Sequence, residues 1–147
     1  MSAGWAHTVA LRTNGTLWTW GLNLAGDLGD GTTTDHHVPE HIGTATSWAR
    51  VAAHSLHGVA VRTDGTLWAW GFNAHGQLGD GTKTDRYAPV QIGTATNWAS
   101  VASGAASTIA LRTNGGIWVW GSNELGQLGD GTTTDHHRPE RITTMTR

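Results

Sequence analysis

Short runs in which apolar residues alternate with small or polar ones predict β-strands along this chain. Residues 58–62 alternate in this way, an Asp-Gly pair follows at 64–65, and residues 67–71 form a second alternating run. An Asp-Gly pair between two such runs is typical of a β-hairpin whose turn residues both adopt positive φ. Trp68 and Trp70 lie two positions apart, so their side chains share one face of the return strand.

Two further strands are predicted around this hairpin. Residues 48–52 precede it, and residues 90–92 follow a stretch that has no hydrophobic period and is rich in turn-forming residues. Pro89 stands at the start of the last strand, where it suits a sheet edge because proline has no N–H to donate. With no helical period present, the unit is expected to be a small antiparallel sheet of about four strands.

This unit occurs three times at a spacing of 50 residues, without insertion or deletion. The predicted units are 1–47, in which the first strand is truncated, 48–97 and 98–147. A single sheet of this size cannot bury its tryptophans, whereas stacking unit on unit hides them between neighbours. We therefore predict an all-β fold made of four-stranded β-propeller blades.

Eight of the nine tryptophans recur in step and are expected to form the core between blades. They are Trp18, Trp20, Trp48, Trp68, Trp70, Trp98, Trp118 and Trp120. Three blades are fewer than the ~4–8 that close a propeller, so an open stack would expose a Trp-bearing face at each end. We expect either a homo-oligomeric ring, with a dimer of six blades favoured, or a segment of a longer propeller.

Residues 51–79 resemble the repeat of the regulator of chromosome condensation family. They share its small-residue turn with His57, its Asp-Gly hairpin, its Trp70-Gly71 pair and its run of Asn-x-x-Gly-Gln-Leu-Gly, which begins at Asn73. The resemblance extends over all three units. It implies a seven-bladed propeller that closes by sharing strands from both chain ends.

Three positions depart from that family pattern. His54 replaces a Gly, Ser107 replaces the His, and Asp27 replaces the Gln. For the eukaryotic founder, the resemblance also implies exchange-factor activity on a small GTPase. That activity needs an inserted loop, and this chain has no insertion between its units.

Composition excludes several other functions. The net charge is −2 and Lys83 is the only lysine, which argues against nucleic-acid binding and against a polybasic membrane anchor. No apolar run reaches the ~18 residues of a membrane helix. With no cysteine, disulfides and thiol chemistry are ruled out.

Paired histidines are the candidates for metal binding. His36-His37 and His136-His137 have suitable ligand atoms, but the second unit carries Arg86-Tyr87 at that place, so a solvated loop is the preferred interpretation. The nearby Asp-Gly-Thr-Thr-Thr-Asp run lacks the acidic ligand pattern of a calcium loop and suggests Asx turns. We expect no metal and no cofactor.

Two other repeated positions are assigned structural roles. His7 and His57 stand at a strand start after a tight turn and are expected to be structural. Arg12, Arg62 and Arg112 end the second strand of each unit, and each is expected to pair with an Asp. No nucleophilic triad and no phosphate loop stands out, so the chain is not expected to be an enzyme.

Positions that differ among the three units cluster at turns, which is typical of a scaffold that binds through its loops. The candidate binding residues are Trp5, Leu22, Leu24, His36, His37, Leu56, Phe72, His75, Arg86, Tyr87, Glu124, His136 and His137. The favoured function is a non-catalytic scaffold for an unidentified protein partner. The alternatives are a carbohydrate-binding propeller with Trp pockets and, by family resemblance alone, exchange-factor activity.

Overall fold

The computed structural model describes residues 1–143 as three four-stranded antiparallel sheets, which confirms the all-β prediction. The N-terminal sheet contains β1 (Ser2–Ala3), β2 (His7–Leu11), β3 (Leu17–Gly21) and β4 (His36–His41). The middle sheet contains β5 (Trp48–His54), β6 (His57–Arg62), β7 (Leu67–Gly71) and β8 (Arg86–Gln91). The C-terminal sheet contains β9 (Trp98–Ser103), β10 (Ser107–Arg112), β11 (Ile117–Gly121) and β12 (His136–Arg141). The described residues include no helix that could cross a membrane.

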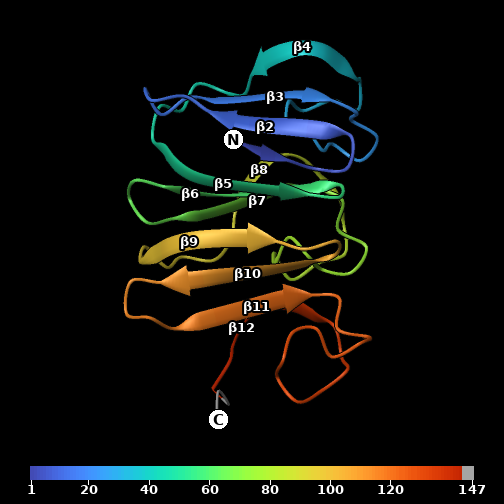
Figure 1. Ribbon diagram of the computed structural model, residues 1–147, viewed down its shortest axis with the longest axis vertical. Coiled ribbons are helices and arrows are strands. Elements are labelled where there is room, and N and C mark those ends of the chain that lie inside the picture. The colour runs from blue at the N-terminus through green and yellow to red at the C-terminus, as the bar shows by residue number, and fades with distance from the viewer. Residues whose placement is uncertain (144–147) are drawn as a thin grey trace.

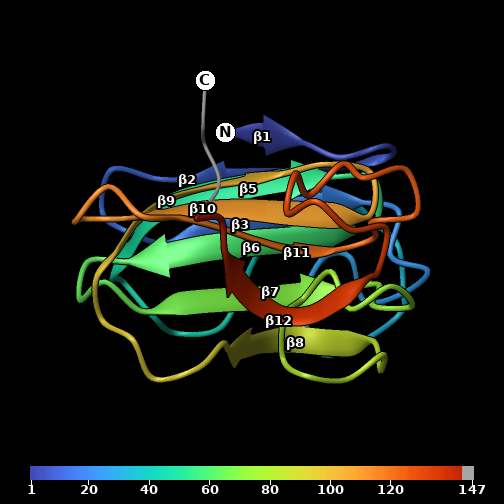
Figure 2. The same cartoon turned by 90° about the horizontal axis from the view of Figure 1, so that it is seen from below.

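In every sheet the strands lie in sequence order, and the three sheets stack face to face (Figure 1). Figure 2 shows the first strands β1, β5 and β9 along one side of the stack, and β8 and β12 along the other. We call this second side, where each sheet ends in its last strand, the rim.

The hairpin turn differs from the prediction. Gly65 has positive φ (+79°), whereas Asp64 does not. Gly65 N donates to Arg62 O and Arg62 N donates to Thr66 O, so the loop has three residues, with glycine at its left-handed position. The Asp64 side chain is used instead to accept hydrogen bonds from Thr66 N and Thr66 Oγ1.

The last strand of the middle sheet also differs, because β8 begins at Arg86 and Pro89 lies inside it. The pairing register between β7 and β8 shifts between Ala69 and Gly71, which leaves the stretch around Pro89 out of the regular ladder. At an irregular position in an edge strand the missing N–H of proline costs nothing.

Two apolar clusters hold the sheets together. Between the N-terminal and middle sheets, Trp70 packs with Val9, Leu17 and Trp48. Between the middle and C-terminal sheets, Trp120 packs against Val59 and Leu67 in the same way. Trp70 and Trp120 are fully buried.

The Trp-bearing face of every sheet therefore points toward the N-terminal end of the stack, and this corrects the expectation of a Trp face at both ends. The outer face of the N-terminal sheet carries the half-buried Trp18 and Trp20. The outer face of the C-terminal sheet is aliphatic, with Ile109 and Leu111 exposed. The reason is that each sheet has one Trp face and one aliphatic face, and every interface joins one of each.

Candidate functional site

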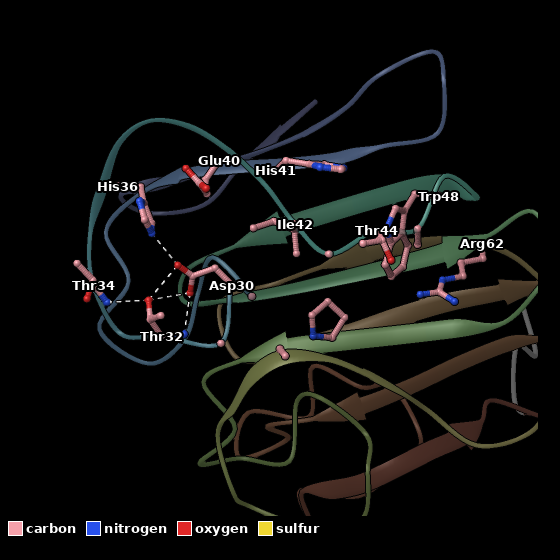
Figure 3. Close-up of a pocket in the computed structure, with 16 residues that line it drawn as sticks. Asp30, Thr32, Thr34, His36, Glu40, His41, Ile42, Thr44, Trp48 and Arg62 are labelled. Atoms are coloured by element: carbon pink, nitrogen blue, oxygen red, sulfur yellow. Dashed lines mark hydrogen bonds and ion pairs between the residues drawn. The ribbon is translucent and has the colours of Figure 1, made fainter.

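A groove opens at the rim between the N-terminal and middle sheets and encloses about 640 Å³. We call it the rim groove. One wall is β4 with the residues that follow it, and the other is formed by the loop around Asp30 and by β8 (Figure 3). Trp48 and Arg62 close one end, and Asp30 with His36 closes the other.

The polar end of the rim groove is built by an Asx turn. Asp30 Oδ1 accepts from Thr32 N at 2.8 Å, and His36 Nε2 donates to Asp30 Oδ2 at 2.6 Å. Partial burial alone would raise the pKa of Asp30, but the hydrogen bonds from Thr32 and His36 outweigh it and lower this pKa. The carboxylate stays ionised, and its oxygens already accept hydrogen bonds from residues of the same unit.

Asn23 organises the loop behind this turn, a role that the sequence pattern did not reveal. Its Nδ2 donates to Asp30 Oδ1, Thr32 O and Thr34 O, and its Oδ1 accepts from Leu28 N. The fully buried Asn73 and Asn123 repeat this role in the other sheets. The only sequence signal was the 50-residue recurrence of the asparagine itself.

The aspartate that begins the Asx turn in each sheet accepts a hydrogen bond from the side chain six residues later. His36 holds Asp30, and Arg86 Nε donates to Asp80 at 2.8 Å. His136 holds the third loop aspartate, Asp130. His36 and His136 are thus part of a repeated hydrogen bond rather than of a solvated loop, and residues 1–143 contain no cluster of three or more metal-binding side chains.

The other end of the rim groove is a cation–π stack. The guanidinium carbon of Arg62 lies 4.5 Å from the ring centroid of Trp48 and 3.9 Å from that of Trp68. Arg112 lies in the same way over Trp98 and Trp118. This corrects the expected Arg–Asp pairs, because antiparallel pairing brings Arg62 opposite Trp48 and therefore onto the aromatic face.

The rim groove is wider than its counterpart in the next interface, and the two differ at position 88, which is alanine here. The equivalent groove between the middle and C-terminal sheets encloses about 270 Å³ and is lined by Arg138, the counterpart of Ala88. The guanidinium of Arg138 lies against Gly81, whereas no atom lies within 4 Å of the place where a Cβ on Gly31 would be. Arg138 is itself exposed, so it narrows the second groove from its outer side without filling it.

The other predicted binding residues do not gather at one site. Trp5 and Leu24 are 76% and 66% exposed, at separate turns. Tyr87 and His137 pack against the loop of the preceding sheet, over Gly26 and Gly76, and so hold the sheets together. His75 Nδ1 lies 3.4 Å from Asp135 Oδ2, which links two loops.

The remaining predicted binding residues also lie scattered along the chain. Leu22, Leu56 and Phe72 are half-buried, while His37 and Glu124 are exposed. Of the predicted set, His36 alone lines the rim groove. Glu40, His41 and Ala88, which also line it, lie in the variable segments but were not singled out.

Three buried groups have shifted pKa values. Burial lowers the pKa of His57 to about 3 and that of His7 to about 4, so both rings are neutral at pH 7. His57 Nε2 donates to Thr108 Oγ1 of the next sheet at 3.1 Å, a structural contact. Burial raises the pKa of Asp27 to about 6.

Sequence comparisons identify the repeat. Two models of the regulator of chromosome condensation (RCC1) repeat match the chain. The first matches residues 14–61, 64–111 and 114–147, and the second matches residues 1–26, 49–77 and 98–127. A search of curated protein sequences finds no significant match.

Solved structures resemble this fold. Prp20p from Saccharomyces cerevisiae, described with its binding to Gsp1p and histones, has a TM-score of 0.86 at 24% identity. Yeast RCC1 (Prp20) bound to Kap60 gives 0.85 at 23%, and human WBSCR16 gives 0.53 at 21%. These matches cover 97%, 97% and 96% of this chain but 37%, 36% and 52% of those chains.

The chain thus spans little more than a third of the Prp20 chains that it resembles. At these identities the likeness concerns the fold: the three sheets match propeller blades. The repeat models match nearly the whole sequence, and the residues that they match form the Trp–Gly hairpins and Asn-centred loops described above. The chain belongs to the regulator of chromosome condensation (RCC1) repeat family.

Proposed function

We propose that this chain is a non-catalytic module that binds a protein partner in the rim groove. The observation that carries the proposal is the pair of unequal grooves, because Arg138 lines the narrower one and alanine stands at the same place, position 88, in the wider one. Partners of this kind have precedent in the fold, since Prp20p is described as binding Gsp1p and histones.

The chemistry of the open groove favours a basic side chain. Relative to the narrower groove it lacks the cation of Arg138 and has the carboxylate of Glu40 where the second unit has Val90. In the narrower groove the chain itself places an arginine at this position, with its guanidinium against Gly81 of the preceding sheet. We therefore propose an extended protein segment that inserts Arg or Lys between Ala88 and Glu40.

Carbohydrate binding receives less support from the aromatic residues. Sugar stacking needs a free indole face, but Arg62 and Arg112 cover Trp68 and Trp118, and His41 stacks on Trp18 at 5.0 Å. Trp5 is 76% exposed, but it lies at a turn and does not line the rim groove. Trp48 is almost fully buried although it lines the groove. Glycan binding is kept as an outcome of the test.

The test uses two variants that copy residues already present in the chain. Ala88→Arg reproduces Arg138, and Glu40→Val reproduces Val90, so both variants are expected to fold. The probe is a displayed random-peptide library selected on the unaltered chain, with a glycan array in parallel. Leu24→Glu, which reproduces Glu124 on an exposed loop, is the matched control.

We expect selected peptides rich in Arg or Lys. Their affinity should fall at least about tenfold, the equivalent of ~1.4 kcal/mol, in Ala88→Arg and in Glu40→Val but not in Leu24→Glu. Peptides that bind all variants equally would contradict the rim groove as the site. Glycan binding without peptide binding would replace the proposal by the carbohydrate alternative.

We also propose a second copy of this chain as a partner, bound through the end sheets and not through the rim groove.

A further inference from the structure

The two ends of the stack carry complementary faces. The N-terminal end face consists of Thr8, Ala10, Trp18 and Trp20, and the C-terminal end face consists of Ile109, Leu111, Ile117 and Gly129. We infer that the C-terminal end face of one copy binds the N-terminal end face of a second copy. This head-to-tail contact continues the two sheet–sheet interfaces seen inside the chain.

The aliphatic side of this contact is already formed twice within the chain. Val9 and Val59, the counterparts of Ile109, are fully buried against the next sheet. Ile109 and Leu111 are 42% and 39% exposed, because none of the three described sheets packs against them. The C-terminal end face thus has the chemistry of a buried interface but is exposed in a single chain.

The aromatic side fits the same scheme. A Cβ on Gly29 would lie 2.9 Å from the indole of Trp70, and one on Gly79 would lie 2.7 Å from that of Trp120. Gly129, the third glycine of this series, has no atom within 4 Å of that place. Trp20 is the one tryptophan of its series that no sheet of this chain covers, so Trp20 of a second copy fits against Gly129.

Backbone groups are also placed for this contact. Gly31 N donates to Tyr87 O and Gly81 N donates to His137 O, both at 2.8 Å across sheet interfaces. By the same 50-residue register, Gly131 N would meet His37 O of a second copy. The central residues of both end faces are uncharged, so pairing buries no like charges.

A contact between two different faces is heterologous and must close into a ring or grow without limit. Propellers close with ~4–8 blades, and two copies of three sheets supply six. We therefore expect a closed pair with two identical head-to-tail interfaces.

The experiment measures the mass of the purified chain by light scattering after size exclusion at micromolar concentration. The expected mass is about 31 kDa, twice the 15.6 kDa of one chain. A folded species of 15.6 kDa would overturn the inference, and so would a mass that keeps growing with concentration. Far-UV and near-UV circular dichroism report folding independently of mass.

Two variants test whether the contact is head-to-tail. Ala10→Glu places a charge on the N-terminal end face, where the counterparts Ala60 and Ala110 are buried, and Ile109→Glu places one on the C-terminal end face. Each alone is expected to be a folded monomer, because each breaks both interfaces of the pair. Leu24→Glu, away from both end faces, should keep the mass of the unaltered chain.

An equal mixture of the two variants should recover pairs. The intact C-terminal end face of Ala10→Glu can still bind the intact N-terminal end face of Ile109→Glu, which leaves one good interface. A symmetric head-to-head or tail-to-tail dimer would respond to only one of the variants and would not be rescued by mixing. Either of those results would overturn the head-to-tail contact.

Discussion

The guanidinium carbon of Arg62 lies 3.9 Å from the ring centroid of Trp68, and Arg62 also lines the rim groove. The same side chain also covers Trp48 at 4.5 Å. One cation thus holds together two tryptophans from different strands of the middle sheet. Its planar group can stack on both rings, which a lysine ammonium cannot do.

Arg62→Lys should therefore destabilise the fold although it keeps the charge. We expect a loss of about 1 kcal/mol in the free energy of unfolding, measured by urea denaturation. Arg12→Lys is the matched control, because Arg12 is exposed and lies 5.0 Å from Trp18 alone. A larger loss for Arg12→Lys than for Arg62→Lys would contradict the double stack.

Trp70→Ala should be far more damaging than a substitution on a surface strand. Trp70 is fully buried between two sheets, and its Nε1 donates to Asp27 O at 3.0 Å. Removing a buried tryptophan typically costs ~3–5 kcal/mol, whereas His37→Ala, on an exposed side chain, should cost under ~0.5 kcal/mol. Equal shifts in the thermal midpoint for the two variants would refute the interface assigned to Trp70.

Asn73→Ala should unfold the loop that carries Asp80. Four hydrogen bonds to Asp80, Thr82, Thr84 and Leu78 depend on this buried amide, and the loss leaves their partners unsatisfied. We expect at least about 2 kcal/mol of destabilisation. Asn114→Ala, at an exposed hairpin where the side chain accepts from Gly116 N, should cost less than half as much.

Asp27→Gln should change the pH dependence of stability. Burial raises the pKa of Asp27 to about 6 in the folded chain from 3.8, so the folded state binds its proton more tightly than the unfolded state does. Stability from this group is complete below about pH 4 and is lost as the pH rises through about 6. Gln is already present at this position in the other units, where His75 N donates to Gln77 Oε1 at 3.0 Å.

We expect Asp27→Gln to be more stable than the unaltered chain at pH 7.5, by on the order of 1 kcal/mol once solvent screening is allowed for. The advantage should vanish near pH 4. Chemical denaturation at several pH values measures both quantities, and Glu124→Gln on an exposed loop controls for the loss of a charge. An advantage that does not change between pH 4 and 7.5 would show that ionisation of Asp27 is not its cause.

Much of the fold could be predicted because strands and hairpins are determined by residues that lie close together in the sequence. The two-residue spacing of Trp68 and Trp70 fixes that they share a face, and the Asp-Gly pair at 64–65 fixes the hairpin. The direction of that face is not local information, since it depends on how whole sheets stack. The sequence therefore indicated tryptophans at interfaces but not that all of them point to one end.

The rim groove could be predicted only in part for the same reason. Position 88 could be recognised as variable among the units, since its counterparts are Val38 and Arg138. That it lies across from Asp30 and Trp48 follows from the packing of β8 against the preceding sheet. Likewise, Arg62 was expected to form an ion pair with an Asp, but the antiparallel pairing of the strands places Trp48 opposite to it.

The prolines in the last strand of each sheet restrict how these molecules can associate with one another. Pro39, Pro89 and Pro139 each lie in a strand whose ladder shifts register, so at the rim the last strand of each sheet presents no unbroken row of free backbone donors. Exposed strand edges otherwise invite sideways strand addition, which leads to disordered aggregates. Because sideways addition is hindered at this edge, association is favoured along the axis on which the sheets already stack, and concentrated protein should form closed rings rather than amyloid.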